Sequence, residues 1–295
     1  MAGAVLSMTA FESALVTAAA VGVACAVLSV FVVLRRWAFI GEGIAHAGFG
    51  GAGTAWMLSL VLPSSVWVSS QGGIYAIAVA FCMCMAVGIG YVTRREELRT
   101  DAAIGIFLVA ALAWGFIAYG IYTHVHMGQS PPGWNDYVLG YMGRISGVHA
   151  AGAAVLCVLV ILLTVLLWKE IVFYCFDPVL AGLSGVRVGF VHYLLLVMVA
   201  LTIVTGMQLM GSLLVTALLV LPGATALLLS PRIGVVLVVS AAIGLVAGVG
   251  GTAVSAQWRF IPLGPGIVML LVGQFGAAYL WRRFAGEMSA GAVNG

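Results

Sequence analysis

Long apolar stretches, separated by short polar segments, run along nearly the whole chain. Stretches of roughly 17 to 25 apolar residues have the length of a transmembrane helix, because about 20 residues cross the hydrocarbon core. The pattern therefore predicts an all-α protein, a polytopic transmembrane helical bundle. Nine spans are predicted, near residues 14–34, 39–62, 72–92, 101–122, 148–168, 189–207, 210–230, 233–253 and 264–281.

The boundary between the sixth and seventh spans is the least marked. Residues 189–230 are almost continuously apolar, and Gln208 to Gly211 mark the predicted division. A half-helix or re-entrant segment in this region would reduce the count to eight. The sequence thus predicts one transmembrane domain over residues 1–295, with 8–9 spanning helices, and a disordered tail over 286–295.

Composition agrees with this pattern. Hydrophobic residues make up 63% of the 295 residues and charged residues only 7%, and the mean hydropathy is +1.19. Soluble domains carry about 25% charged residues. A surface with so few charges is not wetted by water, whereas a surface that faces lipid needs none. The lipid bilayer is therefore the expected solvent.

Charge placement gives the orientation. If nine spans are counted from an outside N-terminus, two of the twelve basic residues, Arg144 and Arg259, fall outside. Cytoplasmic loops carry the excess of Lys and Arg in membrane proteins. The sequence therefore predicts the N-terminus outside, the C-terminus inside and the 123–147 loop outside. The ten inside residues are Arg35, Arg36, Arg94, Arg95, Arg99, Lys169, Arg187, Arg232, Arg282 and Arg283.

The net charge argues against a nucleic-acid-binding protein, and the cysteine spacing argues against a C-x-x-C or zinc-finger motif. The net charge is only +3 and the basic residues stand at helix ends rather than in a patch, so no nucleic-acid partner is expected. None of the cysteines has a C-x-x-C or zinc-finger spacing. We interpret all five as small apolar packing residues. They are Cys25, Cys82, Cys84, Cys157 and Cys175.

Glu42 is the one carboxylate predicted within a span, about a turn beyond Trp37, rather than in a loop or at a helix end. His46 follows four residues later, so the two side chains share a helical face. Ionisable residues inside a membrane are costly and usually mark a pathway or a binding site. A carboxylate with an imidazole is a plausible ligand pair for Mn²⁺, Fe²⁺ or Zn²⁺. A Glu–His pair that only ties two helices together, or a glutamate that snorkels to the interface, remains an alternative.

The nearby glycines are interpreted as helix-packing residues, and the other histidines have interpretations besides metal binding. Gly41, Gly48 and Gly51 lie around the pair, and small residues let helices pack closely. His192 lacks an acidic residue at helical spacing, which favours a hydrogen-bonded core histidine. His124 and His126, in the outer loop, are candidate receivers of a metal ion, although such pairs are more often solvated.

Several catalytic motifs are absent. The only lysine, Lys169, follows Trp168, so no G-x-x-x-x-G-K-[ST] phosphate-binding loop exists. Neither H-E-x-x-H nor G-x-S-x-G occurs. The chain is therefore not expected to be an enzyme, and any ATP-driven step requires a separate partner chain.

Short motifs in register over residues 35–275 carry a family resemblance. The run from Gly41 to Ala47, GEGIAHA, resembles the G-D-x-x-[SA]-H-A signature of the ABC transporter integral membrane type-3 family. The family comprises permease subunits of bacterial manganese, zinc and iron importers. Further agreement lies at Asp101 to Ile106, Leu139 to Ser146, Phe176 to Gly185, Gly211 to Pro222 and Pro262 to Val268.

The resemblance implies a function and partners. It implies a permease of the bacterial cytoplasmic (inner) membrane, working as a homodimer with two ATP-binding-cassette ATPase subunits and an extracytoplasmic metal-binding protein. The transported divalent metal is the cargo, and no tightly bound cofactor is expected. Glu42 and His46 correspond to the metal path. The segment with Phe176, Asp177, Ala181 and Gly185 resembles the element that packs against the ATPase.

On this resemblance Asp177 caps a short helix that Pro178 starts, and Ala181 and Gly185 are small so that a second protein can sit close. The chain departs from the family pattern at Glu42, where aspartate is common, and conservatively at Leu139. The longer side chain puts a metal preference carried over from relatives in doubt. The alternative from a different class is a stand-alone secondary transporter or channel. A membrane enzyme or scaffold is a third and weaker alternative.

Overall fold

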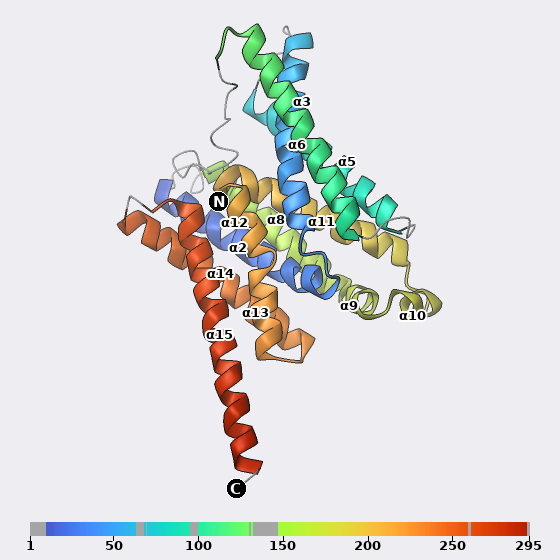
Figure 1. Ribbon diagram of the computed structural model, residues 1–295, viewed down its shortest axis with the longest axis vertical. Helices are drawn as coiled ribbons and strands as arrows, with labels where there is room; N and C mark the ends of the chain where they lie inside the picture. Colours follow the sequence, from blue (N-terminus) through green and yellow to red (C-terminus); the bar gives the residue numbers. More distant parts are fainter. Residues whose placement is uncertain are drawn as a thin grey trace. The chain divides into compact units, whose positions relative to one another are not determined.

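The computed structural model describes residues 10–62, 68, 70–94, 100–129, 131, 147–258 and 261–293. Every regular element in these residues is an α-helix (Figure 1), which confirms the predicted all-α class. The predicted motif at Leu139 to Ser146 lies outside the described residues, as do Arg95, Arg99, Arg144 and Arg259. The helices form two compact units.

The first unit comprises residues 1–36, 142–167 and 217–295. Helix α2 is its centre, because α8, α13 and α14 all pack against it. Gly22 of α2 lies against Gly244 of α14, and a buried hydroxyl pair, Ser29 and Ser240, lies 3.2 Å apart between the same two helices. The elements are α2 (Ala10–Leu34), α8 (Gly147–Leu166), α13 (Leu221–Leu229), α14 (Ile233–Gln257) and α15 (Leu263–Val293).

The second unit comprises residues 37–141 and 168–216. Helix α3 is its centre, because α5, α6 and α11 all pack against it. The short helices α9 and α10 contact α11. The elements are α3 (Ile40–Val61), α5 (Gln71–Arg94), α6 (Thr100–Val125), α9 (Trp168–Phe176), α10 (Pro178–Leu183), α11 (Val188–Met210) and most of α12 (Ser212–Leu218).

Seven helical segments of the described residues are long and apolar enough to cross a membrane. The bent pair α8 and α9 raises the number to eight if the pair forms one span. The coarser prediction, a multi-span helical membrane protein, is thereby confirmed. Helix α3 is not in this set, because glycines, Glu42 and His46 lower its hydropathy. The seven segments are α2, α5, α6, α11, α12 with α13, α14 and α15.

Two connections differ in how well the sequence predicts them. The predicted division near Gln208 to Gly211 is confirmed, since α11 ends at Met210 and Gly211 adopts a φ of 89°. The predicted spans leave residues 169–188 as a connecting loop, which is wrong for α9. This helix buries Ile171, Tyr174 and Cys175, and its nine residues are too few to stand out as a periodic apolar pattern.

The C-terminal helix α15 extends to Val293 and thus reaches into the 286–295 tail. Disorder of the tail stays a prediction.

Candidate functional site

The first part of α3 is enclosed by its own unit except at two side chains. From Ile40 to Gly53 every residue is buried apart from Glu42 and His46. Their side chains are 46% and 30% exposed. The only ionisable residues in this segment are therefore also its only accessible ones.

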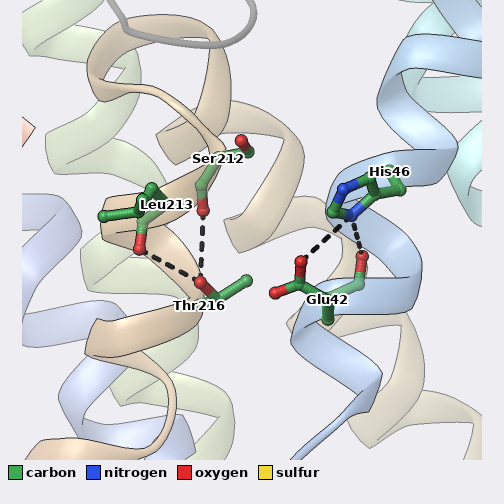
Figure 2. A network of polar contacts seen from close by, with 5 residues as sticks. All are labelled: Glu42, His46, Ser212, Leu213 and Thr216. Atoms are coloured by element: carbon green, nitrogen blue, oxygen red, sulfur yellow. Dashed lines mark hydrogen bonds and ion pairs between the residues drawn. The ribbon is translucent and has the colours of Figure 1, made fainter.

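Glu42 and His46 form a compact pair (Figure 2). The Nδ1 atom of His46 lies 2.9 Å from the backbone carbonyl oxygen of Glu42 and 3.4 Å from its Oε1. A carbonyl oxygen only accepts hydrogen bonds, so Nδ1 carries the proton in this contact. In a neutral imidazole the lone pair is then on Nε2. The backbone of α3 thus fixes the tautomer that leaves Nε2 available for a metal ion.

Glu42 lies closer to a helix end than the sequence suggests. Helix α3 begins at Ile40, so Glu42 stands in its first turn, at a helix end. Its predicted place among the carboxylates is thereby corrected. The first turn of a helix has unpaired N–H groups and a positive dipole end, which favour a carboxylate there.

Helix α12 of the same unit lies opposite the pair in Figure 2, with Thr216 drawn on the side of Glu42. The hydroxyl of Thr216 donates to the carbonyl of Leu213 at 3.0 Å, with a longer contact of 3.4 Å to Ser212. Helix α12 follows directly after the break at Gly211. Sequence reasoning did not single out this polar side chain, since a lone threonine in an apolar stretch carries no signal.

The glycines of α3 occupy close contacts with neighbouring helices. A Cβ on Gly51 would stand 2.7 Å from Cα of Ala78 in α5. Gly48 lies against the Met207 side chain of α11, and Gly41 is buried at the start of α3. Close approach of this kind requires small residues.

The other histidines differ from His46. His192 is buried, with Nδ1 2.7 Å from Tyr174 Oη and Nε2 3.2 Å from the carbonyl of Gly90. The prediction of a hydrogen-bonded core histidine is thus confirmed. His126 stacks on Tyr122 with ring centroids 4.1 Å apart, and His124 is exposed. In the described ranges no three His, Cys, Asp or Glu side chains lie together where they could hold a metal ion.

The cysteine prediction holds for four of the five. Cys25, Cys82, Cys157 and Cys175 are buried, but Cys84 is exposed. It is two residues from Cys82 and therefore on another face of α5.

The segment from Phe176 to Gly185 is a short helix with both ends closed. Asp177 Oδ1 accepts hydrogen bonds from the N–H groups of Val179 and Leu180, each at 2.9 Å, and Pro178 opens the helix. The predicted cap is therefore confirmed. At the other end Gly185 N–H donates to Gly182 and Val186 N–H to Ala181, which is the Schellman pattern.

The structure contradicts the predicted reason for the small size of Ala181 and gives Gly185 a reason of its own. Ala181 is fully buried against its own chain, so it does not face a second protein. Gly185 has a φ of 88° and open space around its Cα, so its backbone conformation explains the glycine. The large exposed side chains are apolar instead: Phe176, Val179, Leu180 and Leu183.

A multi-span helical bundle with an ionisable pair on an enclosed helix, and a capped helix with an apolar outer face, define a membrane transport subunit. The chain belongs to the ABC 3 transport family, which matches residues 7–281. It is therefore a permease, a multi-pass protein of the bacterial cytoplasmic membrane, and ATP is hydrolysed by a separate chain.

Named relatives and a solved structure resemble the chain over most of its length. The manganese transport system membrane protein MntC of Halalkalibacterium halodurans is 30% identical over 94% of this chain and 88% of the relative. The chelated iron transport system membrane protein YfeD of Yersinia pestis is 33% identical over 83% of this chain and 76% of the relative. PsaBC from Streptococcus pneumoniae, solved in complex with Fab, has a TM-score of 0.74 at 25% identity, with 95% of each chain covered.

Proposed function

We propose that this permease imports a divalent transition-metal ion, manganese or iron, and that Glu42 and His46 bind the ion as it crosses. The names of the relatives, manganese and chelated iron transport proteins, support this cargo. A carboxylate oxygen and an imidazole nitrogen together suit first-row divalent ions. Zinc fits the same two ligands and belongs among the ions to be tested.

The observation that carries this proposal is the accessibility of α3. Burial of every other residue from Ile40 to Gly53 leaves Glu42 and His46 as the one opening in this segment. An ionised carboxylate that faced lipid would be costly, so the opening is better matched by a polar path or a second protein surface. The Nε2 atom of His46, with its lone pair available, is a metal ligand on this path.

Two ligands from one chain bind a metal ion only loosely. A structural zinc site, by comparison, uses four ligands and closes around the ion. Loose binding suits transit, because the ion must leave again. We infer that a second copy of the chain lines the other side of the path, which makes the working permease a homodimer.

The proposed topology has nine spans, with the N-terminus outside and the C-terminus inside. It counts α3 and the α8–α9 pair besides the seven apolar segments. The 22 residues of α3 reach about 33 Å, enough to cross the hydrocarbon core of about 30 Å. This orientation puts α10 in the cytoplasm.

We further propose that α10 is the site where the ATPase docks. Val179, Leu180 and Leu183 are exposed apolar side chains of this capped helix, and Phe176 at the end of α9 is exposed beside them in the chain. Contiguous apolar surface of this kind marks protein contacts. An extracytoplasmic metal-binding protein would deliver the ion to the outer loops.

The test is uptake of metal into proteoliposomes that hold the chain with its ATPase and binding protein. Mn²⁺, Fe²⁺ and Zn²⁺ are compared with and without ATP, for the wild type, Glu42→Ala and His46→Ala. Glu12→Ala, which removes a carboxylate from the first turn of α2, is the matched control. ATP-dependent uptake that both site variants lose and the control keeps is expected.

Two results contradict the proposal in different ways. If both site variants retain uptake, Glu42 and His46 do not bind the ion as it crosses. If uptake is independent of ATP and of the ATPase, the protein is a secondary carrier and α10 is not an ATPase docking site.

A further inference from the structure

His192 is the centre of a buried polar and aromatic cluster in the second unit. The cluster joins four parts of the chain: the end of α9, the end of α5, the start of α11 and the turn that leads into α3. Its members are Trp37, Gly90, Tyr174, His192 and Tyr193. None of them belongs to the proposed metal path or to the apolar face of α10.

The hydrogen bonds of His192 have one consistent assignment. Nε2 lies 3.2 Å from the carbonyl oxygen of Gly90, which only accepts, so Nε2 is the donor. In the neutral ring Nδ1 is then an acceptor, and the hydroxyl of Tyr174 donates to it over 2.7 Å. Both ring nitrogens are used within the protein, so His192 is not a metal ligand.

The cluster has a direct connection to the docking segment. Tyr174 is 2% exposed and lies three residues before Asp177, the cap of α10. The N–H of Asp177 donates to Phe173, so α9 continues without a gap into the cap. A displacement of α10 therefore moves the hydroxyl that holds His192.

On its other side the cluster is connected to α3. The ring of Trp37 meets the imidazole edge-on, with centroids 5.4 Å apart and an interplanar angle of 81°. Trp37 is buried, and its carbonyl accepts a hydrogen bond from Ile40, the first residue of α3. Glu42 follows two residues later.

We propose that His192 is a positioning residue that transmits movement of the docking segment to the start of α3. It links Tyr174 on α9 to Trp37 before α3, while the bond to Gly90 keeps the imidazole anchored on α5. This inference rests on the proposed function, because it joins the proposed ATPase site to the proposed metal ligands. The physical basis is a contiguous set of packed and hydrogen-bonded groups between the two sites.

The experiment measures how many Mn²⁺ ions enter proteoliposomes per ATP hydrolysed. Tyr174→Phe removes only the hydroxyl that holds His192. Tyr193→Phe is the matched control: its ring also meets His192 edge-on, at 5.3 Å, but its hydroxyl is not one of the two partners of the imidazole. Trp37→Phe, which alters the contact on the α3 side, is a second variant.

Transmission by His192 predicts that Tyr174→Phe lowers the ratio of Mn²⁺ to ATP by about three- to tenfold. ATPase binding and ATP hydrolysis stay near wild type, and Tyr193→Phe keeps the wild-type ratio. Trp37→Phe lowers the ratio in the same direction, which keeps the test valid if Tyr174→Phe does not fold.

Three results overturn the inference. An unchanged ratio in Tyr174→Phe and Trp37→Phe means that the cluster is only structural. Parallel loss of uptake and ATP hydrolysis, at a constant ratio, means the same. A wild type without ATP-dependent Mn²⁺ uptake overturns the proposed function itself and this inference with it.

Discussion

Helices α3 and α14 are each packed tightly in their own unit, but they differ in what they bury. Both use glycine at close contacts: Gly51 of α3 lies against Ala78, and Gly248 of α14 against Ala18. Helix α14 is apolar enough to span a membrane, and Ser240 is among its buried polar residues. Helix α3 is less apolar and carries Glu42 and His46. Glycine density therefore indicates packing, whereas the ionisable pair distinguishes α3 as the helix of the proposed transport site.

The largest expected effect is on α3. Glu42→Ala removes a proposed ligand of the ion, and we expect ATP-dependent Mn²⁺ uptake to fall about a hundredfold or more. Initial uptake rates, normalised to folded protein, measure this effect. The equivalent change on α14, Ser240→Ala, leaves the normalised rate unchanged. Similar losses of uptake in both variants would contradict the assignment of the transport site to α3.

Glycine replacement should affect both helices alike. A Cβ on Gly51 would stand 2.7 Å from Cα of Ala78, and one on Gly248 would stand 2.6 Å from the carbonyl oxygen of Ala18. Overpacking of this kind costs about 1–3 kcal/mol, so Gly51→Ala and Gly248→Ala both lower the thermal midpoint in detergent. Gly105→Ala and Gly234→Ala, at positions with nothing within 4 Å, are the controls. Destabilisation by the controls would refute the steric explanation.

A smaller effect is expected at the cap of α10. Asp177→Ala removes both hydrogen bonds to the first turn, which costs about 1 kcal/mol of helix stability. We expect a several-fold lower affinity for the ATPase subunit, measured by titration of the detergent-solubilised permease. Asp177→Asn keeps a capping oxygen and restores most of the affinity. Equal losses in the two variants would instead point to the charge.

The smallest effect concerns the stability of Ser240→Ala. The hydroxyl of Ser240 donates to the carbonyl of Ala26 at 2.6 Å, and Ser29 donates to the same carbonyl at 2.7 Å. The variant therefore leaves the acceptor satisfied, and the cost is about 0.6 kcal/mol, typical of hydrogen bonds between transmembrane helices. A detergent unfolding curve measures it. A loss of several kcal/mol would mean that the pair is essential to the first unit.

Apolar length was sufficient to locate the long helices from the sequence, and Gly211 marked the break between α11 and α12. The capped helix at Asp177 was also predictable, because aspartate is favoured as the N-cap of a helix and proline as its first residue. Each of these features is determined by residues that are close together in the sequence. The family signature pointed to Glu42 and His46, although the proposed role of the pair awaits the uptake experiment.

Contacts between distant residues were not predictable in the same way. Tyr174 and Gly90 meet His192 from 18 and 102 positions away, and no periodicity connects them. Helix α9 was missed because it is short and carries Lys169 and Glu170 in its first turn. The small size of Ala181 was explained wrongly, because burial inside the chain and contact with a partner select the same residue type.

The polar composition of α3 has a consequence for biogenesis. Insertion of a helix from the translocon into lipid depends on its apolarity, and charged residues oppose it. Helix α3 leaves the ribosome before α5, α6 and α11, the helices that later enclose it. Its stable insertion therefore depends on these helices, which are synthesised later. The order of synthesis makes the second unit one that completes its insertion and its folding in the same step.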